Sequence, residues 1–173
     1  MRIEKRLEEL GITLTTPAGP PGEYGKRYGL MKPYFLSGKL LFLCGHTAGL
    51  EGDKPRYPGR LGHDLSIDEG YKAARQTAIN CISTIKRAVG DLDRVTAIVS
   101  SLNFVACVPE FLEHHKVTNG LTDLLADVFG PHIGVGPRAS IGTPSLSDNY
   151  CFETSLTLQI EELSAPEGDR SPG

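Results

Sequence analysis

The chain has 173 residues, a net charge of −3 and a pI near 5.9, with 39% hydrophobic and 23% charged residues. This length and composition are typical of one globular domain with its own hydrophobic core. The acidic balance, without a strong cluster of Lys and Arg, argues against a nucleic-acid partner. No apolar run approaches the roughly 20 residues of a membrane-spanning helix. Nothing resembles a signal peptide, so we expect a cytoplasmic protein with no membrane partner.

The cysteines and histidines predict neither a disulfide framework nor a metal site. The chain has 4 cysteines and 5 histidines. The cysteines are widely spaced, without a Cys-x-x-Cys pair, which is typical of reduced thiols in the cytoplasm. The histidines lack the spacing of metal ligands, and the adjacent His114 and His115 would point in different directions on a helix. We therefore expect no metal site.

The first part of the chain predicts a helix, a loop and a hairpin. Residues 3–10 are amphipathic and are followed by Gly11, so they indicate a short helix. Residues 13–27 are rich in Pro and Gly and predict an extended loop that carries Tyr24. Residues 28–44 hold two apolar runs around Ser37-Gly38, a pattern typical of a hairpin. A polar loop follows over 49–62, with a short edge strand expected near Arg60.

The middle of the chain predicts a long helix, a strand and a second helix. Ser66 and Glu69 fit a capping box, and apolar residues recur at helical spacing from there until Gly90. Residues 94–105 are rich in β-formers and predict a long strand. Residues 109–129 predict the second helix, which we expect to be weakened or kinked at Asn119-Gly120.

The C-terminal segment predicts a strand with one polar face. From residue 150 to 160 the even positions are mostly apolar and the odd positions mostly polar, with Glu153 on the polar side. Arg138 and Ser140 alternate with apolar neighbours and are expected on the same side. A hairpin symmetric about Ser145-Leu146 would place Arg138 opposite Glu153, with Cβ atoms about 5 Å apart.

Two interpretations of this pair remain open from the residues alone. Arg138 can hold a carboxylate through two parallel hydrogen bonds, and Glu153 can orient a water molecule or take a proton from it. Alternatively, the two side chains form a cross-strand salt bridge on a solvated face, which is the more common role of such a pair.

The predicted elements indicate an α+β fold in which two long helices cover one face of a mixed sheet. Residues 1–163 form one domain, and the polar residues 164–173 are expected to be a disordered tail. The other sheet face is too polar for a core, although its strands look central. Self-association would cover this face and create clefts between subunits.

Three segments carry a resemblance to a known family. They are Gly59-Arg60-Leu61-Gly62-His63-Asp64-Leu65-Ser66, Glu69-Gly70-Tyr71-Lys72-Ala73-Ala74-Arg75 and Gly90-Asp91-Leu92-Asp93-Arg94-Val95. With them, residues 1–162 resemble the RidA/YjgF family of imine deaminases, also labelled endoribonuclease L-PSP, in its longer chorismate-mutase-like branch. The resemblance implies a homotrimer with three interface clefts that hydrolyse small 2-imino or enamine acids to keto acids and ammonia, without metal or cofactor.

The resemblance also implies roles for individual residues. Arg138 matches the family's carboxylate-binding Arg, and Glu153 its water-positioning Glu. Tyr24 corresponds to the family's loop Tyr, Asn119 to its helix Asn, and Ser140 to the small residue two positions beyond the Arg. All five are expected to contact or position a small carboxylate substrate.

One segment departs from the family pattern. The family's Ser-Gly-Gln stands here as Cys44-Gly45-His46. Backbone groups near Gly45 are expected to contact the imine region, while Cys44 lacks a strong hydroxyl donor and His46 adds a titratable ring. The identity of the substrate therefore stays open.

Other functions remain in competition. A non-catalytic trimeric module that binds small carboxylates would need Arg138 but not Glu153. RNA cleavage follows from the older family label, yet it calls for clustered Lys and Arg. Chorismate mutase activity is suggested by a shared fold, which does not establish function.

Overall fold

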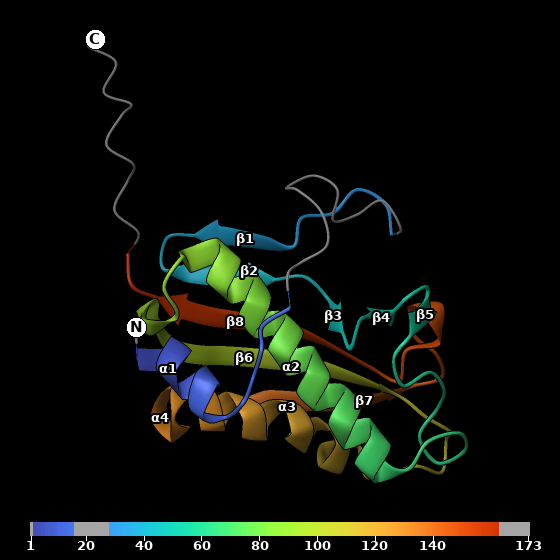
Figure 1. The fold of residues 1–173 in the computed structure, drawn as a ribbon. Helices are drawn as coiled ribbons and strands as arrows, with labels where there is room; N and C mark the ends of the chain where they lie inside the picture. Colours follow the sequence, from blue (N-terminus) through green and yellow to red (C-terminus); the bar gives the residue numbers. More distant parts are fainter. Residues whose placement is uncertain (1, 16–27, 163–173) are drawn as a thin grey trace, which may run out of the picture.

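The computed structural model describes residues 2–15 and 28–162, and Figure 1 shows their arrangement. Tyr24 and the predicted tail lie outside these residues. The helices are α1 (Arg2–Glu9), α2 (Ile67–Val89), α3 (His114–Phe129) and α4 (Pro131–Gly134), with 3-10 turns η1 (Leu92–Arg94) and η2 (Ser147–Asn149). The strands are β1 (Tyr34–Ser37), β2 (Leu40–Leu43), β3 (His46–Thr47), β4 (Leu50–Glu51), β5 (Lys54–Pro55), β6 (Val95–Ala106), β7 (Arg138–Thr143) and β8 (Phe152–Ile160).

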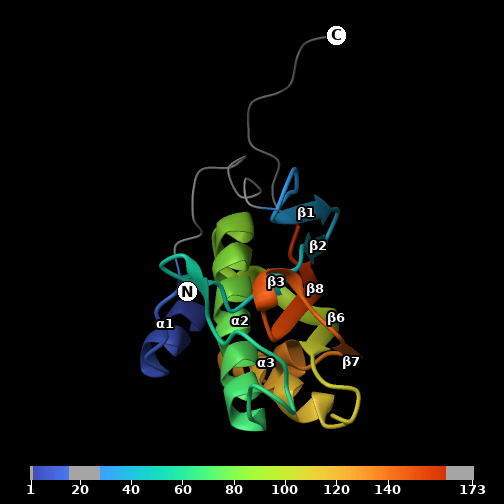
Figure 2. The same cartoon turned by 90° about the vertical axis from the view of Figure 1, so that its right-hand side faces the viewer.

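The main sheet is mixed and carries its long helices on one side, as the sequence predicts. Its strand order is β1-β2-β8-β6-β7, and β3 also pairs with β8. Strands β6 and β7 are parallel, whereas the other pairs in the sheet are antiparallel. Figure 2 shows α2 and α3 on the same side of the sheet. The fold is therefore the α+β arrangement expected from the sequence.

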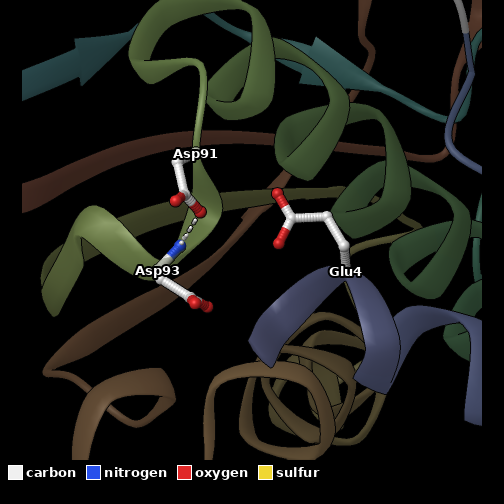
Figure 3. Close-up of side chains that lie close together, drawn as sticks. All are labelled: Glu4, Asp91 and Asp93. Atoms are coloured by element: carbon white, nitrogen blue, oxygen red, sulfur yellow. Dashed lines mark hydrogen bonds between the residues drawn. The ribbon is translucent and has the colours of Figure 1, made fainter. Parts of the chain in front are cut away.

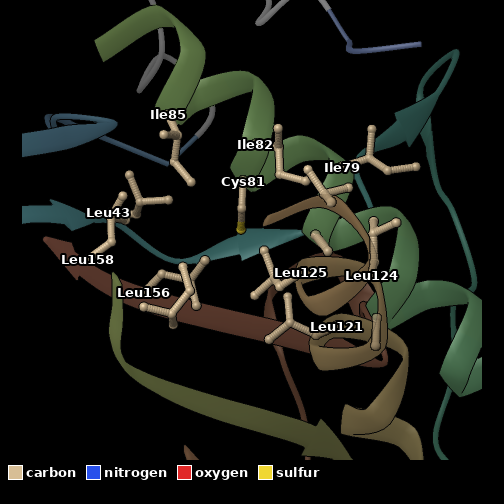
Figure 4. Close-up of a cluster of buried hydrophobic side chains, with 14 of the residues drawn as sticks. Leu43, Ile79, Cys81, Ile82, Ile85, Leu121, Leu124, Leu125, Leu156 and Leu158 are labelled. Carbon is tan, nitrogen blue, oxygen red and sulfur yellow. The ribbon is translucent and has the colours of Figure 1, made fainter. Parts of the chain in front are cut away.

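The core lies between this helical layer and the sheet (Figure 4). On β8 the even positions from Phe152 to Ile160 are all buried, which confirms the predicted alternation. They pack with apolar residues of both long helices, namely Cys81, Ile82, Ile85, Leu121, Leu124 and Leu125. Each fully buried Leu or Ile contributes roughly 1.5–3 kcal/mol to the free energy of folding, so burial of this layer stabilises the packing of the helices on the sheet.

The predicted local signals are confirmed at several places. Ser66 and Glu69 form the capping box at the start of α2, and Gly90 ends this helix with a φ of 75°. Strands β1 and β2 form the expected hairpin, with Gly38 and Lys39 in the turn. The edge strand predicted near Arg60 forms only as isolated bridges, Pro58 with Tyr150 and Leu61 with Cys107, and β4 and β5 form a separate two-stranded hairpin before this position.

Helix α3 is continuous through Asn119-Gly120, so the predicted kink is wrong, and the helix begins at His114 rather than near residue 109. The reason lies in how α3 packs on α2. Gly120 is buried, and a Cβ added there would overlap the carbonyl oxygen of Tyr71. Glycine permits this close approach, and the packing outweighs its low helix propensity of about 1 kcal/mol.

The predicted hairpin between β7 and β8 is also wrong. Strand β6 lies between them, because β7 follows α3 in a parallel crossover from β6, while β8 pairs antiparallel with the other side of β6. Parallel neighbours require a long connection, and α3 supplies it. The alternation in the sequence gives each strand its faces but does not show that a third strand separates them.

No helix within residues 2–15 and 28–162 is long and apolar enough to cross a lipid bilayer.

Candidate functional site

Arg138 lies at the start of β7, an edge strand, and its guanidinium rests against α3. Nη1 donates to Thr122 Oγ1 at 2.7 Å, and Nη2 donates to Asn119 Oδ1 at 2.7 Å. Nη2 also donates to the carbonyl of His115 at 3.5 Å. All three acceptors are uncharged, and no carboxylate among the described residues pairs with Arg138. Its positive charge therefore remains available to an anionic ligand, together with the N–H groups that α3 does not use.

The backbone beside Arg138 is fixed by a buried polar network. The Asn103 side chain, fully buried on β6, donates to the carbonyl of Ala139 at 2.8 Å and accepts from Thr154 at 2.7 Å. Next along β7, Ser140 donates to Thr118 of α3 at 2.9 Å. Because β6 on one side and α3 on the other hold β7, the guanidinium is presented from a rigid support, as ligand-binding sites require.

Glu153 lies on the opposite side of the sheet, which no helix of residues 2–15 and 28–162 covers. Its side chain is partly buried, and no hydrogen bond or ion pair joins it to another described residue. Burial raises the pKa of the Glu153 carboxyl group because the charged form loses water without gaining a partner. A carboxylate in this condition is suited to accept a proton from a water molecule.

Gly45 gives the Glu153 carboxylate its space. A Cβ at position 45 would overlap Glu153 Oε1. The glycine lies in a β-bulge, because three residues separate Phe42 from His46 whereas two separate Thr157 from Thr154 on β8. Bulges are common beside active sites, where the extra residue redirects the strand. Cys44 and Gly45, two predicted substrate-binding residues, therefore lie beside Glu153 in the same chain.

Arg138 and Glu153 do not meet within one chain, contrary to the predicted cross-strand pair. Arg138 aligns with Ser101 of β6, whereas Glu153 aligns with Phe104 on its other side. This offset separates their Cα atoms by about 14 Å, given ordinary strand spacing and rise. Arg138 and Ser140 also face α3, while Glu153 faces away from the helices. The structure groups Arg138, Asn119 and Ser140 in one place, and Cys44, Gly45 and Glu153 in another.

The helix-free sheet face is more apolar than the sequence suggests. The centre of the face is polar along β8, but large exposed side chains flank it on both sides. They are Phe35, Leu40, Phe42, Leu102 and Ile141, of which Phe35 is 56% exposed. Phe35 and Phe42 are cross-strand neighbours. A patch of this kind on a folded domain is typical of an interaction surface.

The three neighbouring carboxylates of Glu4, Asp91 and Asp93 have structural partners (Figure 3). Glu4 forms an ion pair with Lys86 of α2. Asp93 accepts the backbone N–H groups of Arg2 and Ile3, and Asp91 accepts that of Asp93. The cluster therefore caps and anchors α1.

Sequence reasoning identified Asn119 but missed Thr118 and Thr122, the other α3 side chains that contact Ser140 and Arg138. His114, Thr118 and Thr122 recur every fourth position and thus form one stripe along α3. Thr118 contacts Ser140, and Thr122 contacts Arg138. A polar stripe on a helix with an otherwise buried apolar face was the available signal.

Comparison with known proteins shows that the chain is similar to a described family and to a relative from Trypanosoma cruzi. Residues 11–152 match the family described as "YjgF/chorismate mutase-like, putative endoribonuclease". The matched segment includes Arg138 and ends one residue before Glu153. Protein TCP17 of Trypanosoma cruzi is 32% identical over 159 residues, which cover 92% of this chain and 94% of the relative.

Two solved structures share the whole fold. A protein of unknown function from Agrobacterium tumefaciens is 34% identical, with a TM-score of 0.79 and 92% of each chain covered. A protein from Shewanella oneidensis MR-1 that carries the endoribonuclease description is 29% identical, with a TM-score of 0.82. The match covers 92% of this chain and 100% of that one. The topology described above is therefore shared with both structures.

Proposed function

Because the chain belongs to the YjgF/chorismate mutase-like family, we propose that it is a deaminase that hydrolyses small 2-imino acids to 2-keto acids and ammonia. One observation carries the proposal. The guanidinium of Arg138 and the carboxylate of Glu153 are held by the fold, yet neither has an ionic partner among the described residues. A substrate with a carboxylate and a hydrolysable C=N bond needs one group of each kind.

The residue types fit each step of the reaction. Arg138 binds the substrate carboxylate, and Asn119 and Thr122 orient the guanidinium. Glu153 accepts a proton from water as the oxygen attacks the imine carbon, and the C=N electron pair moves to nitrogen. Nitrogen takes up that proton to give a neutral carbinolamine. The hydroxyl proton of the carbinolamine then passes through Glu153 to nitrogen as the C=O bond forms, the C–N bond breaks and ammonia leaves. Holding the reactants together supplies most of the acceleration, since the imine carbon is already electrophilic.

We further propose that the site forms between copies of the chain in a homotrimer. Arg138 and Glu153 lie on opposite sides of one sheet, so a cleft containing both must take them from two copies. The exposed apolar residues of the helix-free face, together with the edge strand β7, offer the surface for this association. Ser140 and the backbone near Gly45 then line the cleft from the two sides, together with Tyr24, whose position lies outside the described residues.

The proposal is tested by generating 2-aminoacrylate in place with a separate dehydratase. The release of pyruvate is followed with and without the protein. We expect the wild-type chain to accelerate release, and Glu153→Gln to reduce the acceleration by roughly 10²-fold or more, the scale of general acid–base catalysis. Pyruvate binding, measured by calorimetry, should persist in this variant because Arg138 is unchanged.

The same measurements separate the competing functions. A binding module would bind pyruvate through Arg138 and show no acceleration with any imino acid tested. An unchanged rate in Glu153→Gln would remove Glu153 from the mechanism. Cleavage of a labelled RNA that is lost in Arg138→Ala would instead support the endoribonuclease description.

A further inference from the structure

The Cys44-Gly45 bulge is held from the helical side by a buried histidine. His46 is 3% exposed, and its ring lies between β3 and α2. Nδ1 is 2.8 Å from the carbonyl oxygen of Cys44, and Nε2 is 2.8 Å from Thr84 Oγ1. Two hydrogen bonds therefore link the first residue of the bulge to the C-terminal half of α2.

These contacts define which nitrogen of the ring carries the proton. A carbonyl oxygen only accepts, so Nδ1 must donate to Cys44, and Nε2 then accepts from the Thr84 hydroxyl. Burial lowers the pKa of His46, although its hydrogen bond to Cys44 acts in the opposite direction. The ring is thus a neutral link with one fixed tautomer.

The bulge in turn determines where the Glu153 carboxylate can lie. Gly45 follows the carbonyl that His46 holds, and the carboxylate occupies the space that a side chain at position 45 would fill. A second contact supports the same segment: Asn80 of α2 donates to the carbonyl of Thr47, the residue paired with Glu153. A shift of the bulge would therefore move the backbone that shields the carboxylate from water.

We propose that His46 and Thr84 are positioning residues for Glu153, acting through the Cys44-Gly45 bulge. They lie on the helical side of the sheet, while the carboxylate that they position lies on the other side. The effect on turnover rests on the proposed deaminase function, whereas the effect on the carboxylate can be measured without it.

Substitutions of Thr84 test the proposal with little change in shape. Thr84→Val removes the hydroxyl group that donates a hydrogen bond to His46 Nε2, whereas Thr84→Ser keeps a hydroxyl group at this position. Thr77→Val is the matched control, because Thr77 is equally buried on α2 but donates only to the carbonyl of Ala73 in the same helix. His46→Asn, which keeps a donor near the position of Nδ1, provides a second variant.

The first measurement is the pH titration of the Glu153 carboxyl carbon by NMR, with selective ¹³C labelling and Glu153→Gln for assignment. In Thr84→Val we expect the pKa to fall toward its ordinary value of 4.5, because the loosened bulge admits water to the carboxylate. Thr84→Ser and Thr77→Val should retain the wild-type titration. A titration unchanged in both Thr84→Val and His46→Asn would overturn the inference.

The second measurement is turnover of the imine. Thr84→Val should lower kcat by roughly 10-fold to 100-fold with little change in KM, since displacements of about 1 Å have effects of this size. Thr77→Val should keep the wild-type kcat after any loss of stability is taken into account. If the titration responds but no variant, including wild type, hydrolyses the imine, the proposed function fails while the positioning role stands. Equal losses of kcat in Thr84→Val and Thr77→Val would argue against positioning.

Discussion

At Arg138 the positive charge is held by neutral acceptors rather than by an acid. Asn119 and Thr122 orient the guanidinium without neutralising it. A structural ion pair would need a carboxylate in their place. This choice of side chains favours a role in which the missing anion comes from a ligand.

Asn119→Asp tests this interpretation at the residue scale. The new carboxylate lies within hydrogen-bonding distance of Arg138 and competes with the ligand for its charge. A partly exposed pair of this kind contributes about 1 kcal/mol, so pyruvate affinity should fall roughly fivefold to tenfold. Asn119→Ala, which removes the acceptor without adding charge, is the control and should have a smaller effect. Equal affinities in both variants and wild type would show that Arg138 does not bind the carboxylate.

His46 predicts how stability depends on pH. Because burial lowers its pKa, the unfolded chain binds a proton near pH 6.5 that the folded chain does not. Stability from this residue is therefore present above pH 6.5 and falls as the pH decreases below it, by up to about 1.4 kcal/mol per pH unit. Urea unfolding between pH 7.5 and 5.5, at fixed protein concentration, should show a shallower loss in His46→Asn. Parallel curves for the two proteins would contradict the prediction.

Among the secondary-structure elements, α2 and α3 approach each other so closely at position 120 that only a glycine fits there. Gly120 faces the backbone of α2 at Tyr71, so the two helices are closer there than side chains would allow. The contact brings Asn119 and Thr122 to the edge of the sheet, where they meet Arg138. The close packing at Gly120 thus helps to position the α3 side chains that contact Arg138.

Gly120→Ala should destabilise the protein by about 1–3 kcal/mol, the usual effect of overpacking. The added methyl group must push α3 away from α2, and this effect exceeds the gain of about 1 kcal/mol in helix propensity. Urea unfolding of the full chain measures the loss. A peptide spanning residues 113–130 is the control, because the same substitution should increase its helicity. A more stable full-length variant would mean that α2 and α3 are not in close contact.

At the scale of the whole molecule, the opposite placement of Arg138 and Glu153 requires two copies for one site. Arg138→Ala and Glu153→Gln chains should each be inactive alone. In mixed trimers, about a third of the clefts receive an intact Arg138 and an intact Glu153 from neighbouring copies. Coexpression with two different tags, followed by tandem purification, should therefore recover a substantial part of wild-type activity. Inactive mixed trimers would place the two residues in separate sites, and a stable monomer would exclude the interface cleft.

The local elements follow from the amino-acid sequence. The alternation on β8, the capping box at Ser66 and the apolar stripe of α2 fix their faces through backbone geometry and side-chain hydrophobicity alone. The sequence also pointed to the family through three motif segments, and this resemblance marked Arg138 and Glu153 as candidate residues.

The placement of these elements relative to one another could not be predicted from local patterns and comes from the three-dimensional fold. Strand β6 separates β7 from β8, because a parallel crossover through α3 and an antiparallel return use its two edges. Gly120 is a contact rather than a kink, since the deciding atom belongs to α2, about 50 positions earlier in the chain. The buried partner of His46 is likewise distant in sequence. Local sequence patterns predict the backbone conformation of each segment. Strand register, strand order and close helix contacts depend instead on which residues distant in the sequence come into contact.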